Sequence, residues 1–374
     1  MPKFIHSADW QLGMTRHFLA GEAQPRFDAA RTDAVRTIGT AAVEHGCEFV
    51  VVAGDVFETN FVDRTVVLRA LDAMAATPSI TFYLLPGNHD PLDASSVFRS
   101  RTFVDNRPDN VVVIGSGECI DLGDGVELLG APWFTKRPLG DLVSDACADL
   151  AADGTTRIVV GHGAVDVLSP DRTDPAVISL ERLEALIAEG CLHYVALGDR
   201  HSTTSVGSTG RIHYAGAPEP TDYREVDPGN VLLVDVGPDH CTVEPIPIGS
   251  WRFVDRQWHL NGPSDLDALE AWAASIERRD RCIVKLSFVG QISLTDQARL
   301  DDLLEHYRSL FASVETWERH TDLVVMPDDD ELADLQLSGF AGVALAELRD
   351  RSASDDAVAR DALGLLFRLG ADRS

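Results

Sequence analysis

Three segments in the first 115 residues have the pattern of buried strands, and helical patterns separate them. These segments are residues 4–8, 49–53 and 81–85, and residues 27–41 repeat apolar side chains at helical spacing between the first two. Strands that are apolar on both faces and alternate with helices form mostly parallel sheets whose two faces are covered. The chain is therefore expected to begin with an α/β domain.

Beyond about residue 111 the apolar segments become shorter and turns more frequent, which indicates a second sheet. A four-layer αββα sandwich accommodates both halves of residues 1–250. Residues 251–330 repeat a strand and helix pattern that predicts a small α+β domain. Residues 331–374 contain two amphipathic helical patterns, with Val343, Leu345 and Leu348 in the first and Val358, Ala362, Leu363, Leu366 and Leu369 in the second.

Polar residues follow five of the expected strands. Because ligands bind beyond the carboxyl ends of strands in open α/β sheets, these side chains are expected to meet in one pocket at one sheet edge. A single aspartate or histidine at a strand end is more often a helix cap or a core residue, so the set carries the argument and not its members. The set is Asp9, Gln11, Asp55, Glu58, Asn88, His89, Asp90, His162, Asp199, Arg200 and His201.

These side chains offer oxygen and imidazole donors without thiolate, which suit manganese, iron or magnesium, with zinc as a further alternative. The six cysteines lie far apart and form no CxxC pair, so they predict neither a zinc knuckle nor disulfides. Carboxylates that bridge two divalent ions activate water and hold a phosphoryl group. The set therefore predicts phosphoester hydrolysis.

The charge of the chain limits how it can hold a polyanion. Sixty acidic and 32 basic residues give a net charge of -28, which repels nucleic acid on average. A polyanionic substrate would need metal ions, local arginines or a partner chain. No apolar run reaches the roughly 18 residues that span a bilayer, so a cytoplasmic protein without membrane attachment is expected.

Four stretches resemble the calcineurin-like metallophosphoesterases, and more closely their DNA-repair exonuclease branch, the SbcD-like nuclease subunit. The stretches are HSADWQLG (6–13), AGDVFE (53–58), LPGNHDP (85–91) and YVALGDRHS (194–202), the last continued by YAGAPEPTDYREVDPGNVLLVDV (214–236). The resemblance covers residues 1–250 well and residues 251–374 in layout only. It implies a metal-dependent nuclease, exonuclease or endonuclease, of a DNA double-strand-break repair complex, with an SbcC-like coiled-coil ATPase as partner.

The resemblance also implies a role for each residue of the set. One ion would be held by Asp9, Gln11, Asp55 and His201, and the other by Asp55, Asn88, His162 and Asp199. A hydroxide between the ions would attack the phosphodiester in line. His89, oriented by Asp90, would stabilise the transition state or protonate the leaving sugar oxygen.

Two metal positions depart from the family pattern. Gln11 stands where the family has histidine and is a weaker, neutral donor, and Asp199 also replaces a histidine. An added carboxylate favours hard ions. We therefore predict two manganese ions, with magnesium or iron as alternatives and little preference for zinc.

The third departure is Glu58, in place of a histidine. It would present negative charge to the substrate unless Arg16, Arg64 or Arg200 offsets it, and a solvated loop carboxylate is an equal alternative.

Two further functions stay open at this point. A stand-alone phosphodiesterase acting on nucleotides or small esters suits the acidic surface, and a catalytically weakened DNA-repair scaffold suits the three departures. In the resembled family, residues 251–330 would shape access of DNA ends. The terminal helices would dock on the ATPase through Val343, Leu348, Val358, Leu363 and Leu366, or would instead fold back on the chain or form a homodimer.

Overall fold

The computed structural model describes residues 2–115, 119–326, 339–352, 358–359 and 362. The chain divides into two compact units, residues 1–252 and 253–374. Among the described residues, no helix is both long enough and apolar enough to cross a bilayer.

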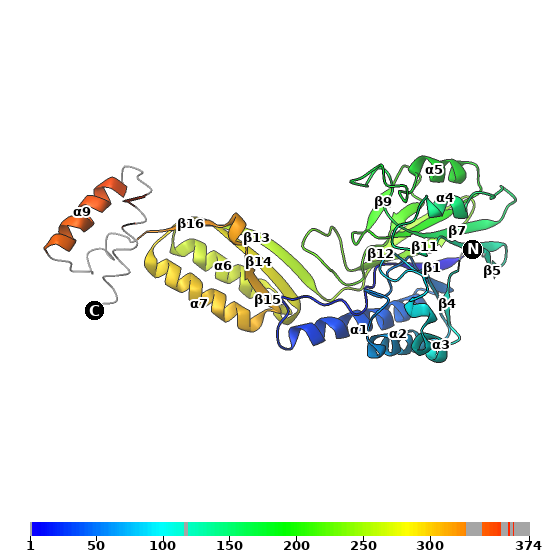
Figure 1. Ribbon diagram of the computed structural model, residues 1–374, viewed down its shortest axis with the longest axis horizontal. Helices are drawn as coiled ribbons and strands as arrows, with labels where there is room; N and C mark the ends of the chain where they lie inside the picture. Colours follow the sequence, from blue (N-terminus) through cyan, green and yellow to red (C-terminus); the bar gives the residue numbers. More distant parts are fainter. Residues whose placement is uncertain (1, 116–118, 327–338, 353–357, 360–361, 363–374) are drawn as a thin grey trace. The chain divides into compact units, whose positions relative to one another are not determined.

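The first unit contains two six-stranded sheets (Figure 1). The first sheet has the order β12 (Cys241–Pro247), β11 (Asn230–Val236), β1 (Lys3–Ser7), β2 (Phe49–Val52), β3 (Thr81–Leu84) and β4 (Val111–Val113). The second has the order β5 (Cys119–Gly123), β6 (Val126–Gly130), β7 (Thr156–His162), β8 (Tyr194–Gly198), β10 (Ile212–Tyr214) and β9 (Thr204–Val206). Strands β1 to β4 are parallel to one another, as are β6, β7 and β8.

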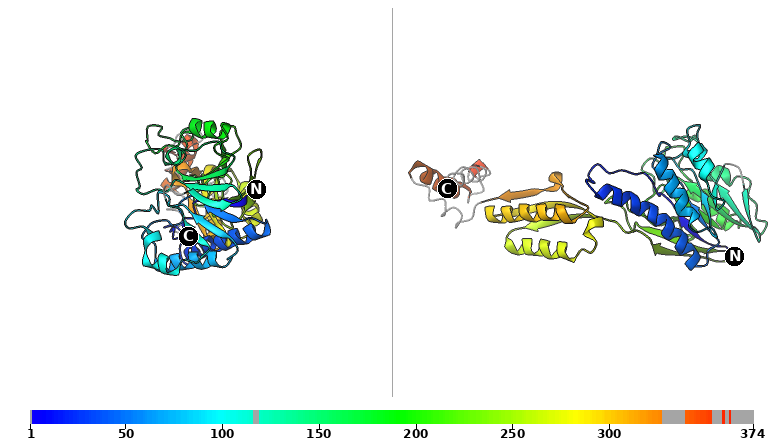
Figure 2. Two further views of the ribbon diagram at one scale, coloured as in Figure 1. Left: turned by 90° about the vertical axis from the view of Figure 1, so that its right-hand side faces the viewer. Right: turned by 90° about the horizontal axis from the view of Figure 1, so that it is seen from below.

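Helices cover the outer face of each sheet, as Figures 1 and 2 show. On the first sheet lie α1 (Ala23–Glu44), α2 (Arg64–Ala75) and α3 (Arg101–Asn106), and a short 3-10 turn, η1 (Val97–Arg99), precedes α3. On the second lie α4 (Leu142–Ala146) and α5 (Leu180–Ala188). This arrangement confirms the predicted α/β sandwich of sheets flanked by helices.

Burial on both faces explains why the central strands lack polar alternation. In β1, Phe4 packs between the two sheets with Val51 of β2 and Val160 of β7. The next residue, Ile5, points the other way and packs under α1 with Val35. One face of the first sheet thus packs against its helices, and the other face packs against the second sheet.

The second unit is a smaller α+β domain. Its four-stranded sheet contains β13 (Arg252–Leu260), β14 (Cys282–Ile292), β15 (Ser313–Thr316) and β16 (Asp322–Val325), and β14 pairs with both β15 and β16. Helices α6 (Pro263–Ser275) and α7 (Leu294–Leu310) pack on this sheet, with η2 (Arg279–Arg281) and η3 (Glu318–His320) as 3-10 turns. The roles assigned to residues 251–330 and 331–374 stay predictions.

Of the two expected terminal helices, the first is present as α9 (Phe340–Ser352). Its Val343 is exposed, as is Val358 of the second pattern. Leu363, Leu366 and Leu369 lie outside the described residues.

Candidate metal centre

The donor residues follow strands of both sheets, which corrects the expectation of one sheet edge. Strands β1, β2 and β3 belong to the first sheet, and β7 and β8 belong to the second. The two sets of carboxyl ends meet: the Asp199 amide after β8 donates to Asp9 Oδ1 after β1 at 3.0 Å. Likewise, His162 Nδ1 at the end of β7 lies 2.8 Å from the Ala53 carbonyl after β2. Packing the sheets face to face therefore assembles the site.

Three glycines allow the loops to approach so closely. A Cβ atom at Gly54 would collide with the His162 ring, and one at Gly198 would collide with the Ala53 carbonyl oxygen. A Cβ atom at Gly87 would overlap Asp55 Oδ1. No other residue type fits these positions without moving a donor.

The donor loops also hold strained backbone. Four of the donor-loop residues have a positive φ, in the left-handed region that residues other than glycine seldom adopt. The φ values are 52° for Asp9, 44° for Gln11, 54° for Asp55 and 93° for Asp199. Such strain persists only where surrounding contacts enforce it, and it concentrates at functional sites. Here it turns four donor side chains towards one another.

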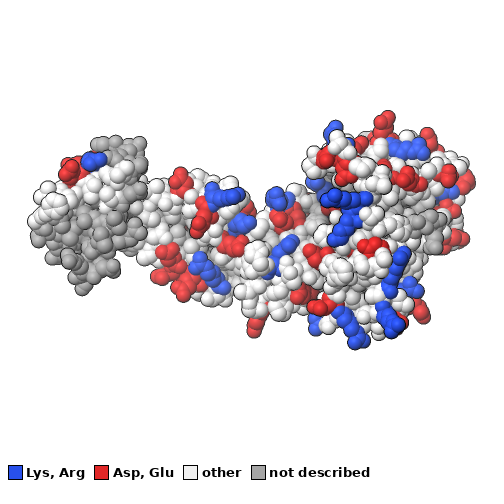
Figure 3. All heavy atoms as spheres, in the orientation of Figure 1, with Lys and Arg blue, Asp and Glu red and all other residues white. Residues whose placement is uncertain are grey.

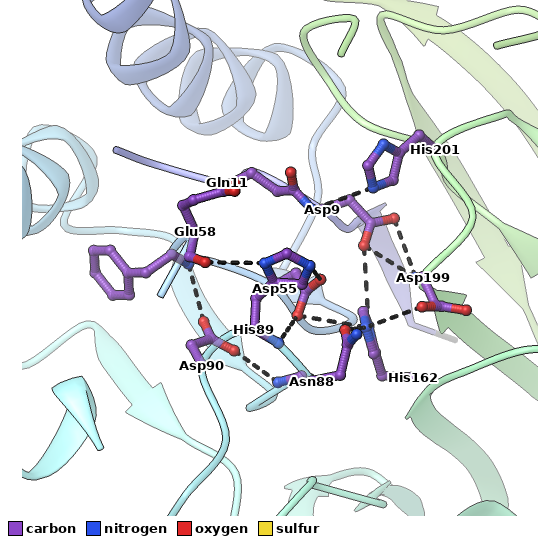
Figure 4. Close-up of polar contacts among 12 residues, drawn as sticks. Asp9, Gln11, Asp55, Glu58, Asn88, His89, Asp90, His162, Asp199 and His201 are labelled. Carbon is purple, nitrogen blue, oxygen red and sulfur yellow. Dashed lines mark hydrogen bonds and ion pairs between the residues drawn. The ribbon is translucent and has the colours of Figure 1, made fainter. Parts of the chain in front are cut away.

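The centre of the site is a buried group of Asp9, Asp55 and His162, whose ligand atoms all lie within 4.8 Å of one another (Figure 4). His162 Nε2 lies 3.5 Å from Asp55 Oδ1 and 3.8 Å from Asp199 Oδ1. Because His162 Nδ1 donates to the Ala53 carbonyl, the neutral ring presents the Nε2 lone pair to this group.

Asn88 completes this side of the site. Its Oδ1 lies 2.8 Å from His162 Nε2, and turning the amide would place its nitrogen 3.1 and 3.0 Å from the two Asp55 oxygens. The amide can thus donate to Asp55 in one orientation. In the other, it offers an oxygen to a cation.

His201 and Gln11 form the opposite side. Gln11 is buried, and its Nε2 lies 3.2 Å from His201 Nε2. His201 Nδ1 contacts Thr221 Oγ1 at 2.6 Å and Glu225 Oε1 at 3.1 Å. The structure therefore brings together all seven expected metal ligands, Asp9, Gln11, Asp55, Asn88, His162, Asp199 and His201.

Burial and the neighbouring charges shift the pKa values of the central residues in different directions. Burial raises the pKa of Asp9 to about 6, although His201 and His162 act in the opposite direction. Burial disfavours the charged form of His162, but Asp55, Asp199 and Asp9 together raise its pKa well above the usual value. Burial alone would also raise the pKa of Asp55, yet His162 holds it below the usual value. Three carboxylates thus gather around His162, and a bound cation would balance their charge.

The expected pairing of His89 with Asp90 is wrong. Asp90 accepts from the backbone amides of Phe57 at 2.9 Å and Gly87 at 2.8 Å, and burial raises its pKa to about 7. His89 instead donates from Nδ1 to the Glu58 carbonyl at 2.9 Å. Asp90 therefore shapes the loops, because a carboxylate bound by two amides has its oxygens engaged there.

The two substrate-side candidates differ in exposure, since Glu58 is half-buried and Arg200 is exposed. Burial raises the pKa of the Glu58 carboxyl, while His89 and Arg16 lower it. Arg200 is exposed and donates to Thr204 Oγ1 at 3.0 Å, and Arg64 is the exposed first residue of α2. Of the three expected arginines, Arg16 is thus the one whose charge acts on Glu58.

Sequence reasoning missed the residues that orient His201. Glu225 and Thr221 lie within the stretch 214–236, which carried the resemblance but received no role. It also missed Arg31 of α1, which is buried and donates to the carbonyls of Trp10 at 3.0 Å and Pro220 at 3.0 Å. Their only sequence signal is polarity within otherwise apolar or loop segments.

Comparison with known proteins places this centre in a family. The sequence profile of the calcineurin-like phosphoesterases matches residues 2–219. The chain belongs to this family. No curated protein sequence matches the chain.

Two solved structures are similar to part of the chain. A protein of Thermus thermophilus has 8% identity and a TM-score of 0.41, with 66% of this chain and 99% of that one covered. A dimetal phosphatase from Danio rerio has 12% identity and a TM-score of 0.37, with 65% and 98% covered.

Calcineurin-like phosphoesterases use a dinuclear divalent metal site, and the residues present fit one. Asp9 and Asp55 are buried carboxylates, burial outweighs the effect of the nearby histidines on the pKa of Asp9, and the His162 ring is held with Nε2 facing both. Both the family and the residues of the site thus indicate metal-dependent hydrolysis of a phosphoester.

Proposed function

We propose that the protein is a metal-dependent phosphodiesterase that cleaves DNA, as the nuclease subunit of a double-strand-break repair complex with an SbcC-like coiled-coil ATPase. The observation that carries this proposal is the stretch 214–236. It resembles the DNA-repair branch, and it supplies Glu225 and Thr221 to the metal ligand His201. The second unit, residues 253–374, supports a role beyond small esters, because all the expected metal ligands lie in the first unit and hydrolysis of a small ester would leave the second unit without a task.

Asp9, Gln11, Asp55 and His201 would hold one ion, and Asp55, Asn88, His162 and Asp199 the other. When bound, a pair of divalent ions supplies Lewis acidity and activates water. Gln11 has to turn its amide so that the oxygen replaces the nitrogen now facing His201. The carboxylate-rich set leads us to propose manganese, and metal analysis that finds stoichiometric zinc after purification without added metal would contradict this.

His89 has the geometry of a proton donor. Its Nδ1 proton is engaged by the Glu58 carbonyl, so Nε2 is the atom that can exchange a proton with the substrate. The ring lies beside the metal group, with Nε2 4.0 Å from Asp55 Oδ2. We therefore assign His89 to the leaving sugar oxygen.

A catalytically weakened scaffold is the second candidate, favoured by Gln11 and Glu58. The Gln11 amide nitrogen faces His201 Nε2, and Glu58 Oε2 is buried without a hydrogen-bond partner. A stand-alone phosphodiesterase on small esters is favoured only by the net charge of -28.

Hydrolysis of a nitrophenyl phosphodiester and of single-stranded DNA, with and without manganese, separates the three. Metal-dependent activity on both supports the nuclease, and activity on the ester alone supports the small-ester enzyme. Activity on neither supports the scaffold. The variant Asp55→Asn, purified in parallel, removes the shared ligand and controls for contaminating nucleases.

A further inference from the structure

The segment of residues 219–225, between β10 and β11, lies against the side of the centre that contains His201. Thr221 is buried, and the Glu225 side chain is 7% exposed. Both oxygens of this carboxylate are engaged: Oε2 accepts from the Thr221 amide at 2.9 Å, and Oε1 accepts from the Thr221 hydroxyl. The carboxylate is thus fixed in place before any ligand binds.

The same two side chains face one nitrogen of His201. Nδ1 lies 2.6 Å from Thr221 Oγ1 and 3.1 Å from Glu225 Oε1. Because the Thr221 proton points to Glu225, Thr221 has only lone pairs to offer His201, and the carboxylate offers only lone pairs as well. Nδ1 must therefore carry the proton, which leaves the Nε2 lone pair directed into the site, where it faces the Gln11 amide nitrogen at 3.2 Å.

Two arginines hold this segment in register with the β1 loop. Arg16 donates to the Thr221 carbonyl at 2.8 Å, and Arg31 donates to the Pro220 carbonyl at 3.0 Å. Arg31 also donates to the carbonyl of Trp10, the residue between Asp9 and Gln11. Arg31 thus connects the loop that contains the expected ligands Asp9 and Gln11 with the segment that contacts His201.

We propose that Glu225 and Thr221 are positioning residues for His201: together they fix the Nδ1–H form of the ring and aim Nε2 at the ion shared with Asp9, Gln11 and Asp55. This inference rests on the proposed function, because it concerns the orientation of the His201 ring in the same metal centre. Carboxylate partners of metal-binding histidines fix the ring and raise its basicity. Neither residue is expected to touch the substrate.

The direct test is the tautomer of His201 in the metal-free full chain, read from nitrogen-15 NMR of the imidazole at alkaline pH, where the ring is neutral. The wild type is expected to carry its proton on Nδ1. The double variant Thr221→Val with Glu225→Ala is expected to populate the Nε2–H form, and Glu225→Gln to retain Nδ1–H through its amide oxygen. The proposal is overturned if the wild-type ring carries its proton on Nε2. It is also overturned if the double variant has the same tautomer as the wild type.

Calorimetric titration with manganese supplies a second readout. In the double variant we expect roughly 10- to 100-fold weaker binding of one ion and unchanged binding of the other, as for lost outer partners of metal ligands. Glu225→Gln should recover most of the loss, and Glu184→Gln, which alters a carboxylate bonded to Ser208 on the surface, should bind as the wild type does. Equal affinities in all four proteins contradict the positioning role.

The two readouts separate this inference from the proposed function. A wild type that binds fewer than two ions counts against the dinuclear phosphodiesterase, and the tautomer still decides the role of Glu225 and Thr221.

Discussion

At the scale of single residues, the site depends on the absence of side chains as much as on their presence. Gly87 does not have a positive φ, so the requirement for glycine is steric: a Cβ atom there would overlap Asp55 Oδ1. The carboxylate in question is the one expected to serve both ions.

Gly87→Ala should therefore displace Asp55 and destabilise the fold. Overpacking of this kind costs about 1–3 kcal/mol, and we expect a lower midpoint of thermal unfolding together with weaker manganese binding. Gly140→Ala is the matched control, because its Cβ atom would meet only Asp145 Oδ2 at 3.7 Å. Manganese affinity equal to that of the control would show that Asp55 is not held where the structure places it.

His89 allows a prediction about the leaving group. General acids contribute roughly 100- to 10,000-fold, and the benefit falls when the leaving oxygen is already a weak base. His89→Gln should thus lose turnover on DNA by about that factor, lose much less on a nitrophenyl ester, and bind manganese normally. Equal losses on both substrates would show that His89 does not protonate the leaving oxygen.

The candidate donor residues could be predicted from the sequence, because each lies at the end of an apolar strand or in the loop that follows it. The partner of His89 could not be. The motif places Asp90 next to it, but both Asp90 oxygens are bonded to the backbone amides of Phe57 and Gly87. Which neighbour a carboxylate contacts depends on loop geometry that sequence spacing does not specify.

At the scale of elements, a buried histidine links the two sheets beneath the site. His6 of β1 is fully buried; its Nδ1 accepts from the Tyr194 hydroxyl of β8 at 3.0 Å, and its Nε2 donates to the Leu197 carbonyl at 3.2 Å. Burial, with a smaller effect of His213, lowers the pKa of His6 to about 3. The neutral ring is thus the form that joins the sheets.

This link predicts a pH dependence of stability. Between the ordinary histidine pKa of 6.5 and about 3, the unfolded chain binds a proton at His6 and the folded chain does not. The free energy of unfolding should therefore fall as the pH falls through this window, by at most about 1.4 kcal/mol per pH unit. His6→Gln removes this titration, so the difference in unfolding free energy between wild type and variant should shrink on acidification.

Denaturant unfolding of both metal-free proteins across this range measures that difference. A constant difference would contradict a neutral, buried His6. The comparison is needed because the raised pKa of Asp9, about 6, acts with the opposite sign in the same window.

The strands were predictable because burial on both faces leaves a plain apolar signal. The division of the donors between two sheets was not, since β3 and β7 look alike in sequence while they belong to different sheets. Pairing depends on contacts between distant segments, and the sequence pattern of one strand does not contain its partner.

At the scale of the whole molecule, the net charge of -28 opposes a DNA substrate. Acidic and basic side chains are interspersed on the face of the protein that Figure 3 shows. Proteins that bind DNA through six or more phosphate contacts lose roughly a thousand-fold or more in affinity between 50 and 200 mM salt. A chain that holds DNA mainly through its metal centre should not lose affinity so steeply with salt.

We therefore expect kcat/KM on single-stranded DNA, measured with saturating manganese, to stay level or rise as potassium chloride is increased. Salt screens the repulsion between the chain and DNA, and the ions in the buried site are screened less. A steep fall with salt would instead reveal an extended basic surface or a contaminating nuclease.

Seven side chains from five strand ends are expected to surround a pair of cations. A crystal soaked in manganese, with anomalous data at the manganese edge, tests this expectation most directly. We predict two peaks about 3.5–4 Å apart, one contacting Asp9, Gln11, Asp55 and His201 and the other contacting Asp55, Asn88, His162 and Asp199. A site without peaks at full soaking, or peaks that leave Asp55 uncoordinated, would contradict the account.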